Sequence, residues 1–168
     1  ESLSAEMTWD LTLIFKDDAA FDDAFEALKA KLTEVSEYQG TLDQGAPAFK
    51  AAIVYLLDVY RQLETLYVYS HLKNDQDTAN ATYQGMYARA SSLLAEASEA
   101  LAWFEPELLT LSDETIWSYF DADPSLEVYR HYVLQLVENR PHILPAEQEA
   151  LLAGAGEIFG AAGNTFSV

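Results

Sequence analysis

Residues 49–101 read FKAAIVYLLDVYRQLETLYVYSHLKNDQDTANATYQGMYARASSLLAEASEAL, and their apolar spacing decides the fold class. Large apolar residues recur every three or four positions in both halves: Phe49, Ile53, Leu56, Tyr60, Leu63 and Tyr67, then Tyr83, Met86, Tyr87, Ala90, Leu93, Leu94, Ala97 and Leu101. Side chains at that spacing lie on one face of an α-helix. We therefore expect two long amphipathic helices. The first begins at Pro47, a residue suited to the first helical position, and ends near Lys73.

The segment between the two periodic stretches is short and polar. Residues 74–78 read NDQDT, which predicts a turn, and Asp77 or Thr78 is expected to cap the following helix. A short connection forces consecutive helices to lie antiparallel. The sequence therefore predicts a long helical hairpin.

A further amphipathic helix is expected on the N-terminal side of the hairpin. Its apolar stripe consists of Phe21, Phe25, Leu28, Leu32 and Val35. Asp17 or Asp18 is the expected N-cap, and Gly40 lies just past the expected end. With the hairpin, this helix predicts a three-helix bundle over residues 17–103.

The two flanks differ from this bundle. Residues 1–16 are predicted to form an extended arm, because Trp9–Phe15 alternates too poorly for a strand. Residues 104–168 are predicted to form shorter helices, at about 108–111, 113–120 and 125–139. Prolines set the breaks between them because proline lacks a backbone N–H and restrains the residue before it: Pro106, Pro124, Pro141 and Pro145. The expected fold is all-α, in a single domain of residues 1–168, a length sufficient for one core.

Composition excludes several functional classes. The chain has no cysteine, so disulfide frameworks and thiolate metal sites are excluded. It has 28 acidic against 9 basic residues and a formal charge of -19, which would repel a nucleic-acid backbone. No apolar run is long enough to span a bilayer, and Glu1-Ser2-Leu3 does not resemble the start of a signal peptide. A cytoplasmic protein without nucleic-acid or membrane partners is expected.

Two histidines lie within the predicted helices. His71 and His131 have aromatic neighbours in sequence, and Glu127 precedes His131 by four residues. A di-metal helical bundle requires paired Glu-x-x-His motifs and two further carboxylates, and this spacing is different. We interpret both histidines as structural or surface groups. A metal-binding bundle remains the weakest alternative.

Other short motifs have structural explanations. Asp75 and Asp77 resemble the start of a calcium loop, but the required glycine and glutamate are absent, so capping explains them better. Gly154, Gly156 and Gly160 do not form a dinucleotide-binding pattern. Residues 80–82 match a glycosylation sequon, which is uninformative without a secretory signal.

His142 has two interpretations. Lying in a break between helices, it could hydrogen-bond backbone groups that the break exposes, which is the interpretation we favour, or it could face a substrate channel.

The stretch from Leu126 to Leu152, LEVYRHYVLQLVENRPHILPAEQEALL, resembles the N-terminal part of oligoendopeptidase F, in the thimet oligopeptidase-like zinc metallopeptidases. The matching positions are Tyr129, Tyr132, Arg140, Pro141, His142, Leu144, Glu147, Glu149, Leu151, Leu152 and Ala153. Further segments are similar in the same order: Trp9–Leu11, Tyr67–Leu72 with Asp75–Thr78, Phe104–Leu109 and Asn164–Ser167. The ordered set covers nearly all of the chain.

This resemblance implies a mostly helical zinc endopeptidase whose halves enclose a channel for oligopeptides. In that family zinc is held by H-E-x-x-H and a downstream glutamate, and this chain lacks the motif. We therefore expect no catalytic, cofactor-binding or metal-binding residue here. The chain would be an N-terminal fragment forming one channel wall, inactive alone, with a C-terminal catalytic domain and an oligopeptide as partners.

That wall is expected to expose an apolar interdomain face, through which the fragment could self-associate. The alternative function is an autonomous acidic helical module that binds partners through a helix groove.

Overall fold

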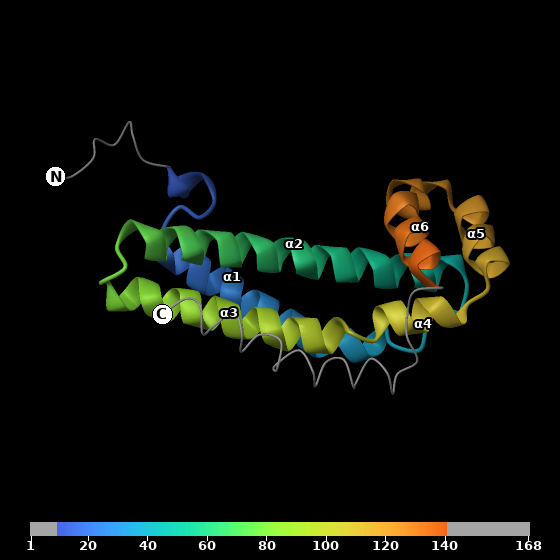
Figure 1. Cartoon of the computed structure of the whole chain (residues 1–168), viewed down its shortest axis with the longest axis horizontal. Helices are drawn as coiled ribbons and strands as arrows, with labels where there is room; N and C mark the ends of the chain where they lie inside the picture. Colours follow the sequence, from blue (N-terminus) through green and yellow to red (C-terminus); the bar gives the residue numbers. More distant parts are fainter. Residues whose placement is uncertain (1–9, 141–168) are drawn as a thin grey trace, which may run out of the picture. The chain divides into compact units, whose positions relative to one another are not determined.

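The computed structural model describes residues 10–140, and their regular structure is entirely helical, which confirms the all-α prediction (Figure 1). The α-helices of this part are α1 Asp18–Lys31, α2 Ala46–Gln76, α3 Ala81–Leu101, α4 Phe104–Thr110, α5 Asp113–Ala122 and α6 Arg130–Asn139. The 3-10 helices are η2 Leu11–Leu13, η3 Leu32–Glu37 and η4 Pro124–Tyr129. The chain divides into two compact units, Glu1–Glu127 and Val128–Val168. Helices α1 to α5 belong to the first unit and α6 to the second.

Helices α2 and α3 form the predicted antiparallel hairpin, and they make the most extensive contact between any two elements of the described part (Figure 1). Most of the facing residues that the periodicity predicts are buried: Phe49, Ile53, Leu56 and Leu63 in α2, and Met86, Ala90, Leu93, Ala97 and Leu101 in α3, whereas Tyr67, Tyr83, Tyr87 and Leu94 are half-buried. Tyr60 is an exception. Its side chain is 40% exposed, so its assignment to the buried stripe was wrong.

The cap of α3 also differs from the prediction. Asn80 is the N-cap, and its side-chain oxygen accepts hydrogen bonds from the backbone N–H groups of Thr82 at 2.9 Å and Tyr83 at 3.3 Å. Asp77 instead follows the last residue of α2 and accepts from the Ala79 N–H at 3.1 Å. The turn therefore comprises residues 77–80 and lies later in the chain than the predicted residues 74–78, because α2 continues to Gln76.

Helix α1 begins as predicted and ends earlier. Asp17 is its N-cap and accepts from the Ala20 N–H at 2.9 Å. After Lys31 the chain tightens into η3, where side chains three residues apart eclipse each other. The predicted stripe is consequently buried only in its α-helical part, and its 3-10 part, Leu32 and Val35, is half-buried.

The sequence predicted an extended N-terminal arm, but Leu11–Leu13 are helical. These residues form η2, capped by Asp10, whose carboxylate accepts from the Thr12 N–H at 3.0 Å. Leu11 is buried, and the ring of Phe15 meets that of Tyr69 edge-on at 5.1 Å between centroids. Apolar contacts and a local cap therefore outweigh the weak strand pattern.

A long-range polar contact holds the loop between η3 and α2. The carboxylate of Glu107 in α4 accepts hydrogen bonds from the backbone N–H groups of Gly40 at 2.7 Å and Leu42 at 2.9 Å. Gly40 has φ of 79°, a left-handed conformation that side-chain-bearing residues rarely adopt. The loop thus satisfies its backbone donors through a side chain 65 or more residues away.

The shorter elements match their predicted positions in part. Helix α5 coincides with the predicted segment 113–120, and Ser112 caps it by accepting from the Thr115 N–H at 3.1 Å. The segment 125–139, predicted as one helix, is divided into η4 and α6. Since η4 starts at Pro124, the tighter 3-10 winding replaces the first turn of the expected helix.

Candidate functional site

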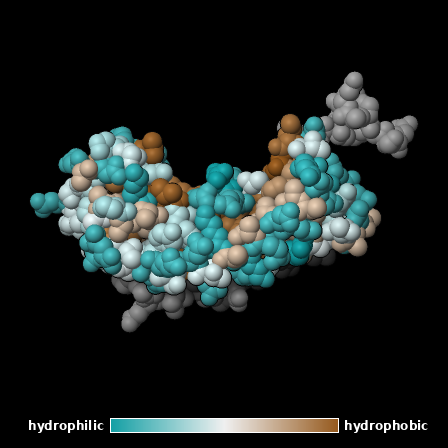
Figure 2. Space-filling model, turned by 180° about the vertical axis from the view of Figure 1, so that it is seen from behind, coloured by the Kyte–Doolittle hydropathy of each residue, from teal (hydrophilic) through white to brown (hydrophobic). Residues whose placement is uncertain are grey.

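The face of α2 that points away from the bundle is apolar at several positions. We call the residues Val54, Leu57, Tyr60 and Val68 the outer face of α2. Val54, Tyr60 and Val68 are 41%, 40% and 39% exposed, and Leu57 is half-buried. The surface visible in Figure 2 is largely hydrophilic, with strongly hydrophobic side chains confined to a few areas. Exposed apolar side chains that share one helix face are candidates for a contact surface.

A charged network borders this outer face. The carboxylate of Asp58 accepts hydrogen bonds from Lys31, from Arg61 at 2.5 Å and from Gln62 at 2.6 Å. The hydrogen bonds from Lys31 and Arg61 lower the pKa of Asp58 to about 2. Asp58 is therefore ionised and paired at neutral pH, and it has no role as a proton donor.

Lys31 also accepts a hydrogen bond from Tyr55, next to this network. Its backbone carbonyl accepts from the Tyr55 hydroxyl at 2.7 Å, and the Tyr55 ring stacks on Tyr38 at 4.2 Å between centroids. Burial, with Glu34 nearby, raises the pKa of Tyr55 to about 12. This hydroxyl remains protonated and acts as a hydrogen-bond donor that joins α2 to the end of α1.

Lys73 is enclosed by aromatic rings near the C-terminal end of α2. Its ammonium lies 4.8 Å from the ring centre of Tyr83 and 5.6 Å from that of Tyr69, and 3.1 Å from the Asp18 carboxylate. Burial alone would lower the pKa of Lys73, but the hydrogen bond to Asp18 and the nearby tyrosines raise it. A lysine held protonated in this way stabilises α1 against the hairpin and is unsuited to act as a nucleophile.

His71, which the sequence singled out, belongs to an aromatic cluster between α2 and α3. Its ring lies 5.3 Å from Tyr87 and 6.1 Å from Tyr67, and its Nδ1 is 3.2 Å from the Asp75 carboxylate. The hydroxyls of Tyr67 and Tyr87 share a hydrogen bond of 3.0 Å, which raises the pKa of Tyr67. The cluster contains one carboxylate and no nucleophile beside the histidine, so it has the composition of a structural contact.

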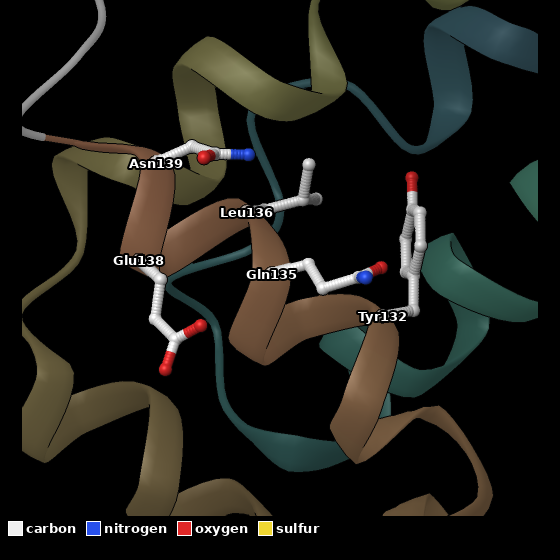
Figure 3. Close-up of a pocket in the computed structure, with 5 residues that line it drawn as sticks. All are labelled: Tyr132, Gln135, Leu136, Glu138 and Asn139. Atoms are coloured by element: carbon white, nitrogen blue, oxygen red, sulfur yellow. The ribbon is translucent and has the colours of Figure 1, made fainter.

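A pocket with a volume of about 440 Å³ lies along α6 (Figure 3). Figure 3 shows that Tyr132, Gln135, Leu136 and Asn139 point to one side of the helix, whereas Glu138 points away from them. Amide and hydroxyl groups of this kind can hydrogen-bond a polar ligand. The only carboxylate in the lining is directed elsewhere, so these residues do not form an acid–base pair.

The other candidates from the sequence are dispersed. Glu127 and His131 are both exposed, and they belong to different compact units. Asp75 pairs with His71, and Asp77 terminates α2, so the two carboxylates of the apparent calcium loop have separate structural contacts. His142 and the glycines at 154, 156 and 160 lie outside the described residues.

Residues 10–140 contain no group of three or more metal-ligating side chains suited to an ion. The complete sequence also lacks H-E-x-x-H. The described residues therefore do not provide the ligand set of a metallopeptidase zinc site. Within the same described residues, no helix has the length and hydrophobicity needed to cross a membrane.

The outer face of α2 was not recognised in the sequence, although one signal was available. Val54 and Val68 lie off the buried stripe of α2, on the side where charged residues are usual. Tyr60 was placed on the stripe because tyrosine fits either environment. Only the packing of α2 against its neighbours separates the two faces.

Comparison with known proteins agrees with the family resemblance found in the sequence. A family model described as Oligopeptidase F matches residues 107–168. Oligopeptidase PepF of Bacillus subtilis is 37% identical over 166 residues, which cover 99% of this chain and 25% of that protein. Group B oligopeptidase PepB of Streptococcus agalactiae is 39% identical over 160 residues, covering 95% and 27%.

A solved structure shows the same relationship. The crystal structure of oligoendopeptidase-F from Enterococcus faecium matches with 59% sequence identity and a TM-score of 0.74, over 90% of this chain and 29% of that one. The chain thus spans about a quarter of the length of the curated relatives that it matches. By sequence and by fold, this chain belongs to the oligoendopeptidase F family and corresponds to its N-terminal part.

Proposed function

We propose that this chain is the N-terminal, non-catalytic wall domain of a zinc-dependent oligopeptidase that hydrolyses short peptides. One observation carries the proposal: relatives named as oligopeptidases align with 95–99% of this chain, whereas the chain covers only 25–27% of their length. Most of each relative therefore lies outside the aligned region. The zinc, the H-E-x-x-H motif and the water-activating glutamate would be supplied by the remainder of the polypeptide.

The geometry of the described residues supports a wall rather than a reaction centre. Charged groups of α2 are paired: Asp58 with Lys31, and Lys73 with Asp18. The histidine of α2, His71, contacts tyrosines and the carboxylate of Asp75. A stiff hairpin that borders a channel would limit the size of the substrate and exclude water from the reaction. The oligopeptide and the C-terminal catalytic part are the partners of this proposal.

We also propose that residues 1–168 act together as one domain of a cytoplasmic enzyme. The absence of cysteine supports a reducing compartment, because proteins exported to oxidising compartments often use disulfides.

The test is reconstitution of peptide cleavage. The complete polypeptide, this chain and the remaining part are prepared separately with zinc, and cleavage of a quenched fluorescent oligopeptide is measured. We expect activity from the complete polypeptide and from the mixture, and none from this chain. Cleavage by this chain alone would contradict the proposal. Full activity of the remaining part with an unchanged limit on substrate length would favour the autonomous interaction module instead.

A further inference from the structure

The inner and lateral sides of α2 are already occupied within its compact unit. The helix packs against α1, α3 and α5, and its inward residues Ile53, Leu56 and Leu63 are at most 2% exposed. The outer face is different, since Val54, Tyr60 and Val68 keep about 40% of their surface accessible. The apolar area on this face therefore has no explanation in the packing of the described unit.

The residue types on the outer face add a second argument. Valine is stiff at χ1 and is less favourable in a helix than alanine, leucine, lysine or glutamate. An exposed helix position without a partner gains nothing from valine to offset this cost. Val54 and Val68 both occupy such positions within a 31-residue helix. A buried contact in the complete protein would explain their presence.

Helix α2 differs from the rest of the chain in its net charge. Helix α2 contains three basic residues, Lys50, Arg61 and Lys73, and three acidic ones, Asp58, Glu64 and Asp75, whereas the whole chain has a formal charge of -19. Two of these residues, Asp58 and Arg61, are paired with each other, and Arg61 lies seven residues from both Val54 and Val68, on the same helix face. Neutral, apolar surface is less costly to remove from water than surface with unpaired charge. The outer face is thus suited to lasting contact with another surface.

We propose that the outer face of α2 is the docking surface for the remainder of the oligopeptidase polypeptide. The choice of occupant rests on the proposed function, because relatives are about four times as long as this chain. A second copy of this chain is disfavoured because each copy would bring a charge of -19 to the contact. The chemistry expected of the docking segment is apolar side chains against Val54, Tyr60 and Val68, with polar or acidic groups opposite Arg61, which lies between the two valines.

The experiment measures thiol labelling, which the absence of cysteine in this chain makes specific. Val54→Cys and Val68→Cys are compared with Ala95→Cys, an exposed position on α3. Each variant is prepared as the complete polypeptide, with any cysteines in the remainder replaced by serine, and as residues 1–168. The rate of reaction with a small maleimide is measured in both forms. The ratio of the two rates cancels differences in thiol pKa between sites.

We expect Val54→Cys and Val68→Cys to react about tenfold or more slowly in the complete polypeptide than in the separate chain, with Ala95→Cys changing little. Equal rates in both forms would overturn the proposal. Protection already present in residues 1–168 would also overturn it: a concentration-independent effect would assign the face to another segment of this chain, and a concentration-dependent one to a second copy. If the separate chain does not fold, the three rates within the complete polypeptide decide.

Peptide cleavage by the same complete polypeptides separates this proposal from the proposed function. Protection without cleavage would retain the docking surface and refute the peptidase activity. Cleavage without protection would retain the peptidase activity and refute the docking surface.

Discussion

The two sides of α2 carry similar apolar residues and have opposite environments. On the inner side, Ile53 and Leu63 are at most 2% exposed and packed within the bundle, whereas on the outer side Val54 and Val68 are about 40% exposed. The composition of a helix therefore does not show which apolar residues form the core. Periodicity identifies the wider apolar stripe as the core face, and the apolar residues left over are the ones that can indicate a contact with another part of the protein.

The largest expected effect is a loss of packing on the inner side. Leu63→Ala should reduce the free energy of unfolding of residues 1–168 by about 2–5 kcal/mol, because it removes buried methyl groups and leaves a cavity. Urea unfolding followed by circular dichroism measures the change. A loss below about 1 kcal/mol would show that the inner side is not the tightly packed core described here.

An intermediate effect is expected at the charged edge between the two sides. Since the pKa of Asp58 falls from its ordinary value of 3.8 to about 2 on folding, its stabilising contribution is present above about pH 4 and is lost as the pH falls toward 2. Asp58→Asn should lower stability at pH 7 by about 1–2 kcal/mol, since Asp58 is partly exposed, and should weaken this pH dependence.

Unfolding measured at several pH values between 2 and 7 tests the prediction. Glu64→Gln on the same helix is the matched control, because Glu64 is exposed and outside the network of Lys31, Arg61 and Gln62. An identical pH profile for the wild type and Asp58→Asn would contradict the assignment.

A smaller effect is expected at the end of the hairpin. Asn80→Ala should cost about 1 kcal/mol, because two backbone N–H groups of α3 lose their acceptor. Thr78→Ala is the control, since the sequence had suggested Thr78 as a cap and its side chain is exposed. Thermal unfolding of both variants distinguishes the two positions. A larger loss of stability from Thr78→Ala than from Asn80→Ala would indicate that Thr78 caps α3, as the sequence had suggested.

The smallest effect is expected on the outer side of α2. In residues 1–168, Val54→Ala and Val68→Ala should each change the free energy of unfolding by less than about 0.5 kcal/mol, because little packing is lost and alanine favours the helix. Urea unfolding under the conditions used for Leu63→Ala allows a direct comparison. A loss of about 2 kcal/mol in either variant would place that side chain in the core.

The hairpin could be predicted from the sequence because its signals agree along more than fifty residues. Apolar periodicity, Pro47 near the start of α2 and a polar turn all favour the same arrangement. The cap of α3 was predicted incorrectly because several capping residues compete within residues 74–80, and α2 continues far enough to exclude the earlier ones. Local preferences of similar strength leave such boundaries to the packing of the whole helix.

The candidate surface was less predictable than the fold. The sequence predicted that an apolar interdomain face exists, but it did not identify the outer face of α2, and it placed Tyr60 on the opposite side. The contact between Glu107 and the backbone at Gly40 and Leu42 was also not predicted. A carboxylate that binds backbone groups more than sixty residues away leaves no local pattern in the chain.

The sequence by itself determined the helical class, the antiparallel hairpin, the acidic charge and the resemblance to the oligoendopeptidase F family, because each depends on composition or on order along the chain. Only the tertiary structure decided which apolar side chains of α2 are buried, where Asp58 finds its cationic partners and how Glu107 holds a distant loop. Burial and long-range hydrogen bonds depend on which elements pack together, and that arrangement is a property of the whole fold.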